Sequence, residues 1–291
     1  PPSLPVVEKD ELIQDDIDRF ILGGIEGNDL EPSRKAEPLV LLRRIFFDLT
    51  GLPPSPQDIK DFQKSSSYES FENVVDRLLE SPRFGERWGR HWLDVARYAD
   101  TTGGGRNNPF PNAHRYRDYV INSFNKDKPF DQFIMEQIAG DLLPSSSNEE
   151  YNEKLTGTGF LALGPHNYEL QDKELLRMEV VDEQLSAVGK AFMGLTMDCA
   201  RCHDHPFDPI PIQDYYSIAG IFRSTNSLVP GNVASFHERD LRDEFGEQRK
   251  QYEQTLAALE KDLKDAVNLI KALGGKELNS NSRSLDPLTL E

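Results

Sequence analysis

Cysteine is scarce in this chain: only two of its 291 residues are cysteines, and they lie three positions apart. A secreted domain held together by disulfides would carry more cysteines, spread more widely. Long apolar runs are also lacking, and no segment is long and apolar enough to span a bilayer. The sequence therefore excludes a disulfide-stapled mini-domain and predicts no transmembrane segment in this chain.

Positive charge is in the minority, with 33 Lys and Arg against 50 Asp and Glu, giving a net charge of -17. No stripe of Lys or Arg stands out, so nucleic acid is not an expected partner, because phosphate binding needs concentrated positive charge. A hydrophobic share of 37% indicates a globular protein rather than a disordered one. The Pro-rich start lacks a basic or apolar leader, and we interpret the chain as a mature or excised fragment that begins with a linker over residues 1–10.

Apolar residues recur at helical spacing along most of the chain, and no segment alternates convincingly in the manner of a strand. The expected fold is mainly α: an irregular multi-helix domain with long loops over residues 11–230, then a heptad-containing helix and mobile tail over residues 231–291. Helices are predicted near residues 13–21, 38–49, 68–80, 85–98, 116–124, 129–139, 173–197 and 214–222, and a further helix begins at Ser55-Pro56. The first has Ile13, Ile17, Phe20 and Ile21 at helical spacing, and the second ends at a breaker over residues 50–54.

The segment 245–273 carries a heptad pattern. One series is Phe245, Tyr252, Leu259 and Ala266, and the interleaved series is Leu256, Leu263 and Ile270. Such spacing predicts a helix with an apolar seam. Its partner remains open between another helix of the same polypeptide and coiled-coil self-association with a second chain.

The two cysteines belong to the sequence Cys199-Ala200-Arg201-Cys202-His203, which fits C-x-x-C-H, the attachment signature of c-type haem. On a helical turn, residues three apart lie on one face, so Cys199 and Cys202 can bond the two vinyl groups on one edge of a single haem. His203 then supplies the proximal nitrogen to iron. Since such attachment occurs outside the cytoplasm, the expected location is a periplasm, the cell surface or the medium.

Three other interpretations of this motif stay open. Zinc is one, with Cys199, Cys202 and His203 or His205 as ligands, although structural zinc takes four ligands and no second pair with metal-ligand spacing is found. A redox dithiol is another, and it would need a βαβ context that the sequence does not offer. The third is a plain disulfide without a cofactor.

The distal side of the haem is less determined. His205 is too close to His203 in sequence to reach the opposite face, and we expect its ring to hydrogen-bond a haem propionate or Asp208. No methionine follows His203. The remaining candidates for the distal ligand are His91, His114, His166, His237, Met135 and Met178.

His91 is the favoured distal ligand, because it stands on a Trp-rich helix where aromatic rings could wall a haem. Arg87 and Arg90 flank it and are candidate partners of the propionates. The alternative is that His91 is a core histidine. Pocket candidates for catalysis are His91, Arg97, Tyr98 and Asp100, with a buried Arg–Asp ion pair as the alternative.

Several longer motifs occur in order over residues 12–225. They are Ile17-Asp18-Arg19-Phe20-Ile21, Leu42-Arg43-Arg44, Asp48 to Pro54, Arg90 to Asp100, Tyr116 to Ile121, Lys128 to Phe133 and Cys199 to Ile210. On these residues the chain resembles a secreted, cytochrome c-associated family that is abundant in Planctomycetes and has long been known as a domain of unknown function.

The resemblance implies large, exported, multi-domain proteins, in which a cytochrome c-like domain often precedes this region and an uncharacterised domain follows it. The heptad helix would then lie between this region and the next domain. His114 departs from the family, where Trp is expected, and His91 lies within a family motif. The resemblance implies a haem and a compartment but no substrate.

Three functions follow as hypotheses. The first is an extracytoplasmic mono-haem domain for electron transfer with a redox partner protein or an adjacent cytochrome domain. The second is a haem oxidase or peroxidase that acts on an extracellular polymer such as a polysaccharide. The third is a binding or assembly domain in which the haem is mainly structural.

Overall fold

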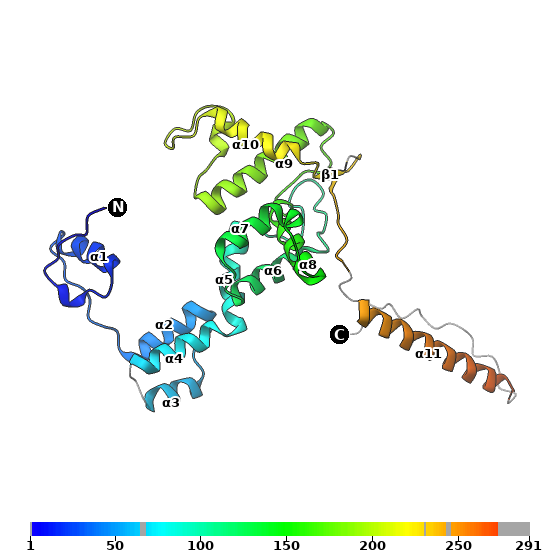
Figure 1. Ribbon diagram of the computed structural model, residues 1–291, viewed down its shortest axis with the longest axis horizontal. Coiled ribbons are helices and arrows are strands. Elements are labelled where there is room, and N and C mark those ends of the chain that lie inside the picture. Colours follow the sequence, from blue (N-terminus) through cyan, green and yellow to red (C-terminus); the bar gives the residue numbers. More distant parts are fainter. Residues whose placement is uncertain (1, 65–67, 230, 243–245, 273–291) are drawn as a thin grey trace.

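The structure is a computed structural model that describes residues 2–64, 68–229, 231–242 and 246–272. As expected, it is mainly helical (Figure 1). The helices are α1 (Asp16–Glu26), α2 (Pro38–Thr50), α3 (Pro56–Lys64), α4 (Tyr68–Leu79), α5 (Pro82–Val95), α6 (Ala113–Asn125), α7 (Phe130–Ala139), α8 (Asn148–Gly157), α9 (Lys173–Val188), α10 (Ile212–Ser224) and α11 (Gly246–Ala272).

Helices α2, α3 and α4 gather at one end of the molecule (Figure 1). They enclose a small core of Leu42, Phe46, Phe62 and Leu78. Helix α2 has proline at its first turn and ends at Gly51, which adopts a left-handed φ of 72°. The predicted helix over 38–49 is therefore confirmed, together with the breaker that follows it.

Helix α1 differs from expectation in the face that it buries. Ile17 and Ile21 are 69% and 59% exposed, whereas Leu22 is buried. The reason is that the contact comes from the preceding segment: a Cβ on Gly23 would lie 3.1 Å from the Pro5 side chain. Helical spacing identified the helix but not the side that packs.

The central core is aromatic and joins α5, α6 and α7. The Trp92 indole donates hydrogen bonds to the Tyr116 hydroxyl at 3.0 Å and to Gln137 Oε1 at 2.9 Å. Its ring packs against Phe133 with centroids 4.9 Å apart and against Phe192 at 5.7 Å. Because an indole N–H needs a partner when buried, this network fixes the depth of α5 in the core.

Helices α9 and α10 lie side by side in the upper part of Figure 1. The predicted helix over 173–197 is confirmed to Val188, where α9 ends, and continues as a π-helical turn over Gly189–Met193. It is wrong only beyond Gly194, which has a φ of 66°. A left-handed glycine ends a helix, so the chain turns before it reaches the cysteines.

Two elements were not foreseen from the sequence. Helix α8 forms where the sequence indicated only loops, with Ser147 as its N-cap through a bond from the Glu150 N–H. A short antiparallel pair joins β1 (Leu228–Val229) to β2 (Ser235–Phe236). Its two residues a strand are too few to give a readable alternation.

Helix α11 extends away from the rest of the chain (Figure 1). The predicted heptad helix is confirmed as a helix, and its seam residues Tyr252, Leu256, Leu259 and Leu263 are exposed. Phe245 and the predicted mobile tail lie outside the described residues, and the pairing of the seam stays a prediction. Across the described part of the chain, no helix is long and apolar enough to cross a membrane.

The contact between α5 and α6 yields a stability prediction. A Cβ on Gly85 would lie 2.4 Å from the Ile121 carbonyl oxygen, whereas a Cβ on Gly24 of α1 would meet nothing within 4 Å. We expect Gly85→Ala to lower the free energy of unfolding by about 1–3 kcal/mol through overpacking. Gly24→Ala should leave it unchanged or raise it by about 0.5–1 kcal/mol. Urea denaturation followed by circular dichroism measures both, and equal midpoints for the two variants would contradict the packing described.

Candidate functional site

The cysteines sit on a short 3-10 turn, η5 (Asp198–Arg201), and Cys202 is its C-terminal cap. Both thiols are free and exposed, whereas Ala200 between them is fully buried. In a 3-10 turn, residues three apart are eclipsed, so burial of Ala200 leaves Cys199 and Cys202 on the outer side together. The expected placement of two thiols on one face is what this turn provides.

The other residue between the cysteines, Arg201, ties the turn to α9. Its Nη1 donates to Asp182 Oδ2 at 2.8 Å, and its carbonyl accepts from the Tyr216 hydroxyl at 3.0 Å. The Tyr215 hydroxyl donates to the other oxygen of Asp182. Burial and the bond to Asp182 raise the pKa of Tyr215, which keeps the phenol a donor. Both residues between the cysteines are thus held from the inside.

His203 is exposed beside the thiols. Its Nδ1 lies 2.7 Å from the carbonyl oxygen of Asp204, which leaves Nε2 without a hydrogen-bond partner in the described structure. An imidazole that donates its Nδ1–H to a backbone carbonyl presents Nε2 as the basic atom. This is the tautomer that an iron ligand needs.

His205 is turned into its own loop. Its side chain is 4% exposed, and Nδ1 accepts the Asp208 N–H at 2.8 Å and the Phe207 N–H at 3.3 Å. Asp208 therefore does contact His205: its N–H donates to Nδ1, and its carboxylate Oδ2 lies 3.5 Å from the same atom. The propionate contact stays a prediction. Phe207, two residues further on, is 93% exposed.

The flank of α5 that carries His91 lies in another part of the molecule. His91 is exposed and packs on Trp88, with ring centroids 5.4 Å apart. Arg90 bonds Asp94 at 3.0 Å on the surface, and Arg87 is half-buried against the Gly51 turn. None of the three is joined to residues 199–203 by a hydrogen bond, ion pair or ring contact in the described ranges.

The remaining distal candidates are scattered. His114 is exposed with Nδ1 3.1 Å from the Pro111 carbonyl, and Met135 is 48% exposed on α7. His166 is buried, Met178 is half-buried on α9, and His237 is exposed. No contact of the described residues brings any of them to His203, so the distal ligand stays a prediction.

The four catalytic candidates do not meet in one pocket. Arg97 points inward and binds Glu183 on α9, with Nη2 to Oε2 at 2.9 Å, and its backbone has a φ of 55°. The Tyr98 hydroxyl donates to Asp100 at 2.7 Å, and partial burial together with that bond raises the pKa of Tyr98 to about 12. His91 faces outward, away from this pair of contacts.

A buried polar cluster around Glu183 was missed by sequence reasoning. Beside Arg97 it contains His166, whose Nε2 lies 3.9 Å from Glu183 Oε2, and Tyr168, whose ring centroid is 5.6 Å from that of His166. Burial, and then the charge of Arg97, lower the pKa of His166 to about 4. Arg97 and Glu183 are 86 positions apart, and no motif in the sequence links them. A left-handed non-glycine residue at a buried ion pair is strained, and the cluster must hold it in place.

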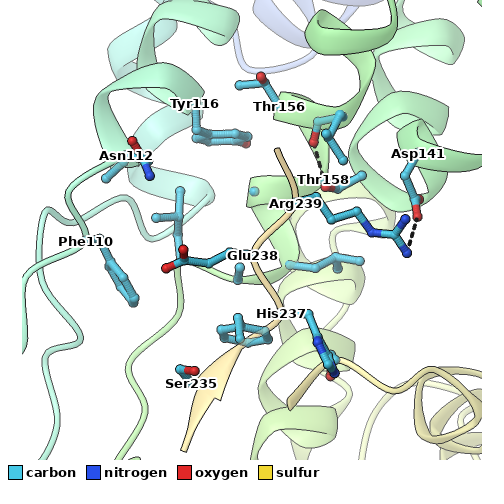
Figure 2. Close-up of a pocket in the computed structure, with 18 of the residues that line it drawn as sticks. Phe110, Asn112, Tyr116, Asp141, Thr156, Thr158, Ser235, His237, Glu238 and Arg239 are labelled. Atoms are coloured by element: carbon cyan, nitrogen blue, oxygen red, sulfur yellow. Dashed lines mark hydrogen bonds and ion pairs between the residues drawn. The ribbon is translucent and has the colours of Figure 1, made fainter. Parts of the chain in front are cut away.

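A cavity of about 1460 Å³ opens between α6, α8, α10 and the segment around β2. Figure 2 shows that segment crossing the cavity, with the Arg239 guanidinium directed at Asp141, 4.0 Å away. His237 and Tyr168 line the cavity, whereas residues 199–211 do not. This cavity is therefore separate from the cysteine turn.

The donor set of the turn fits a c-type haem. Two outward thiols three residues apart match two thioether bonds, and an imidazole with an unengaged Nε2 matches a proximal ligand. A structural zinc ion needs four ligands, and the described ranges hold no group of three or more His, Cys, Asp or Glu side chains placed for a metal ion.

Comparison with known proteins gives one match. The family model PSCyt2, described as "Protein of unknown function (DUF1549)", matches residues 16–227. No curated protein and no solved structure matches the chain.

The buried Arg97–Glu183 pair yields a second stability prediction. The side chains are 21% and 17% exposed, so Glu183→Gln leaves a largely buried guanidinium without its counter-charge. We expect a loss of about 3 kcal/mol in the free energy of unfolding. The control is Asp94→Asn, because the Arg90–Asp94 pair is 70% and 62% exposed and should contribute about 0.5 kcal/mol or less. Equal losses in the two variants, measured by urea unfolding, would contradict a structural role for the cluster.

The lowered pKa of His166 predicts a pH dependence. Its pKa is about 4 in the folded chain against 6.5 for an ordinary histidine, so the unfolded chain takes up the proton first. The contribution of neutral His166 to the free energy of unfolding is complete above pH 6.5. It falls by about 3 kcal/mol as the pH falls towards 4. We expect the free energy of unfolding, measured with urea at both pH values, to fall less in His166→Asn than in the wild type. In exposed His114→Asn it should fall by the same amount as in the wild type. An identical pH dependence in all three proteins would refute the assignment.

Proposed function

The chain belongs to the PSCyt2 family, whose function is unknown, and from that premise we propose that it is an extracytoplasmic domain that carries one covalent c-type haem and transfers electrons. Cys199 and Cys202 would hold the haem by thioether bonds, and His203 would bind its iron. The proposed location is a periplasm or the cell surface, within a planctomycete-type exported protein.

The observation that carries the proposal is the construction of the cysteine turn. Ala200 is fully buried and Arg201 bonds Asp182 at 2.8 Å, so both residues between the cysteines anchor the turn to the rest of the fold. The two thiols and His203 are left on the surface. A disulfide between the cysteines would not require an exposed His203 whose Nδ1 contacts a backbone carbonyl, whereas a haem ligand would.

A bound c-type haem supplies a centre that gains and loses one electron. The chain's own part is to hold that centre at the surface. The turn is tied to α9 by Arg201 and to α10 by Tyr216, and Lys190 bonds Asp198 at its start at 3.0 Å. A turn fixed in this way would hold His203 in one orientation towards a bound haem, which suits electron transfer.

Exposure of the site favours electron transfer over oxidase or peroxidase chemistry. An enzyme of that kind needs an enclosed distal pocket with acid–base groups, and His91, Arg97 and the Tyr98–Asp100 pair do not converge. An exposed edge lets a redox protein or an adjacent cytochrome domain approach closely. With a net charge of -17, this chain would favour partners whose docking face is basic.

A binding or assembly role remains as a second proposal for α11 alone. It rests on the exposed seam of Tyr252, Leu256, Leu259 and Leu263. It does not conflict with electron transfer, since α11 lies away from the cysteine turn (Figure 1).

The test is production of the chain in a periplasm equipped to attach c-type haem. We expect the wild type to keep a Soret band after denaturation and extraction, because a thioether bond survives unfolding. Cys199→Ser with Cys202→Ser should lose the band completely, and His114→Ala, a histidine remote from the turn, should keep it. A wild-type chain that loses all absorbing material on extraction would refute the proposal.

A further inference from the structure

His205 is an unusual residue for an exposed loop, because its ring is buried and fully engaged. Its side chain is 4% exposed, Nδ1 accepts two backbone N–H groups, and Nε2 lies 3.4 Å from the Thr196 hydroxyl. Since Nδ1 accepts, Nε2 carries the hydrogen, so neither ring nitrogen is left to bind a metal. A histidine engaged in this way is part of the scaffold.

What the ring holds is a tight loop of backbone. The His205 N–H donates to the Ile210 carbonyl at 2.9 Å, and the Ile210 N–H donates to the Asp208 carbonyl at 2.7 Å. Ile210 is 8% exposed and belongs to the core between α9 and α10. The His205 ring accepts hydrogen bonds from the N–H groups of Phe207 and Asp208. These bonds close the loop that brings His205 and Ile210 together.

One peptide unit links this loop to His203. The carbonyl of Asp204 and the N–H of His205 belong to the same planar peptide, so fixing one direction fixes the other. The N–H is bonded to Ile210, and the carbonyl accepts from the His203 ring at 2.7 Å. The Asp204 carboxylate accepts the Ile212 N–H at 2.8 Å, which ties the same residue to the start of α10.

We propose that His205 is a positioning residue for His203: by closing the 204–210 loop it fixes the Asp204 carbonyl, which orients the imidazole and sets its basic Nε2. The proposal rests on the proposed function, since His203 is an axial ligand only if the haem is attached. The residue acts through a partner of the metal ligand, and changes of that kind typically weaken metal affinity about 10- to 100-fold.

The experiment compares three variants of His205 in the haem-loaded full chain. His205→Asn keeps an acceptor near the position of Nδ1, His205→Gln moves it towards the position of Nε2, and His205→Leu removes it. Asn28→Leu is the control, because the exposed Asn28 side chain also bonds a local backbone carbonyl, that of Gly24 at 2.7 Å, just after α1, and Asn28 is no candidate ligand. Covalent haem is measured on the denatured chain, and axial ligation is measured by the visible spectrum during acid titration.

We expect all the variants to keep covalent haem, because the thiols are untouched. In His205→Leu and His205→Gln, the pH midpoint at which the axial imidazole is lost should rise by about one to two pH units. This rise corresponds to a ligand that binds about 10- to 100-fold more weakly in competition with one proton. His205→Asn should restore most of the wild-type midpoint, and Asn28→Leu should equal the wild type. If His205→Leu does not fold, the difference between Asn and Gln decides.

Equal midpoints for His205→Asn and His205→Gln, with haem attached in both, would overturn the inference alone. A wild-type chain without covalent haem would overturn the proposed function and this inference with it. A shift of equal size in Asn28→Leu would also overturn the inference, because the effect would then not depend on the 204–210 loop.

Discussion

Two neighbouring carboxylates on α9 hold the parts of this fold that carry chemistry. Asp182 binds Arg201, within the cysteine turn, and Glu183 binds Arg97, at the end of α5. Successive positions on a helix point about 100° apart, so one helix can serve two clusters that do not touch. The position of the cysteine turn relative to the aromatic core therefore depends on α9, and a shift of that helix would disturb both.

This arrangement explains why a chain with one small surface motif is so large. The C-x-x-C-H motif itself is five residues, but it needs α9 for Arg201, α10 for Ile212 and Tyr216, and the loop between these helices for His203. Helix α9 in turn is fixed by the central core through Arg97, which lies over the Phe160 ring at 5.3 Å. A haem attached to this rigid support, as proposed, would have little to rearrange when it changes charge, which suits electron transfer better than substrate turnover.

Much of the fold was predictable because amphipathic helices leave a local signature, as α2, α6 and α7 do. Predictions failed where the cause was non-local or depended on backbone detail. The end of α9 depends on Gly194 in a left-handed conformation, and the buried face of α1 depends on Pro5. For the candidate site, spacing alone identified Cys199, Cys202 and His203, which the structure leaves exposed, and their role stays a proposal. The contacts of Arg97 with Glu183 and of His205 with its own loop do not follow from spacing, because no sequence pattern encodes them.

The central claim is that both cysteines are bonded to one haem. Peptide mapping by mass spectrometry tests it most directly, on protein produced with a haem attachment system, denatured and digested. If both cysteines are bonded to one haem, the digest contains one modified peptide with Cys199, Cys202 and His203, the added mass of one haem and no free thiol. A peptide of unmodified mass with two reactive thiols, or with a disulfide between them, would contradict it.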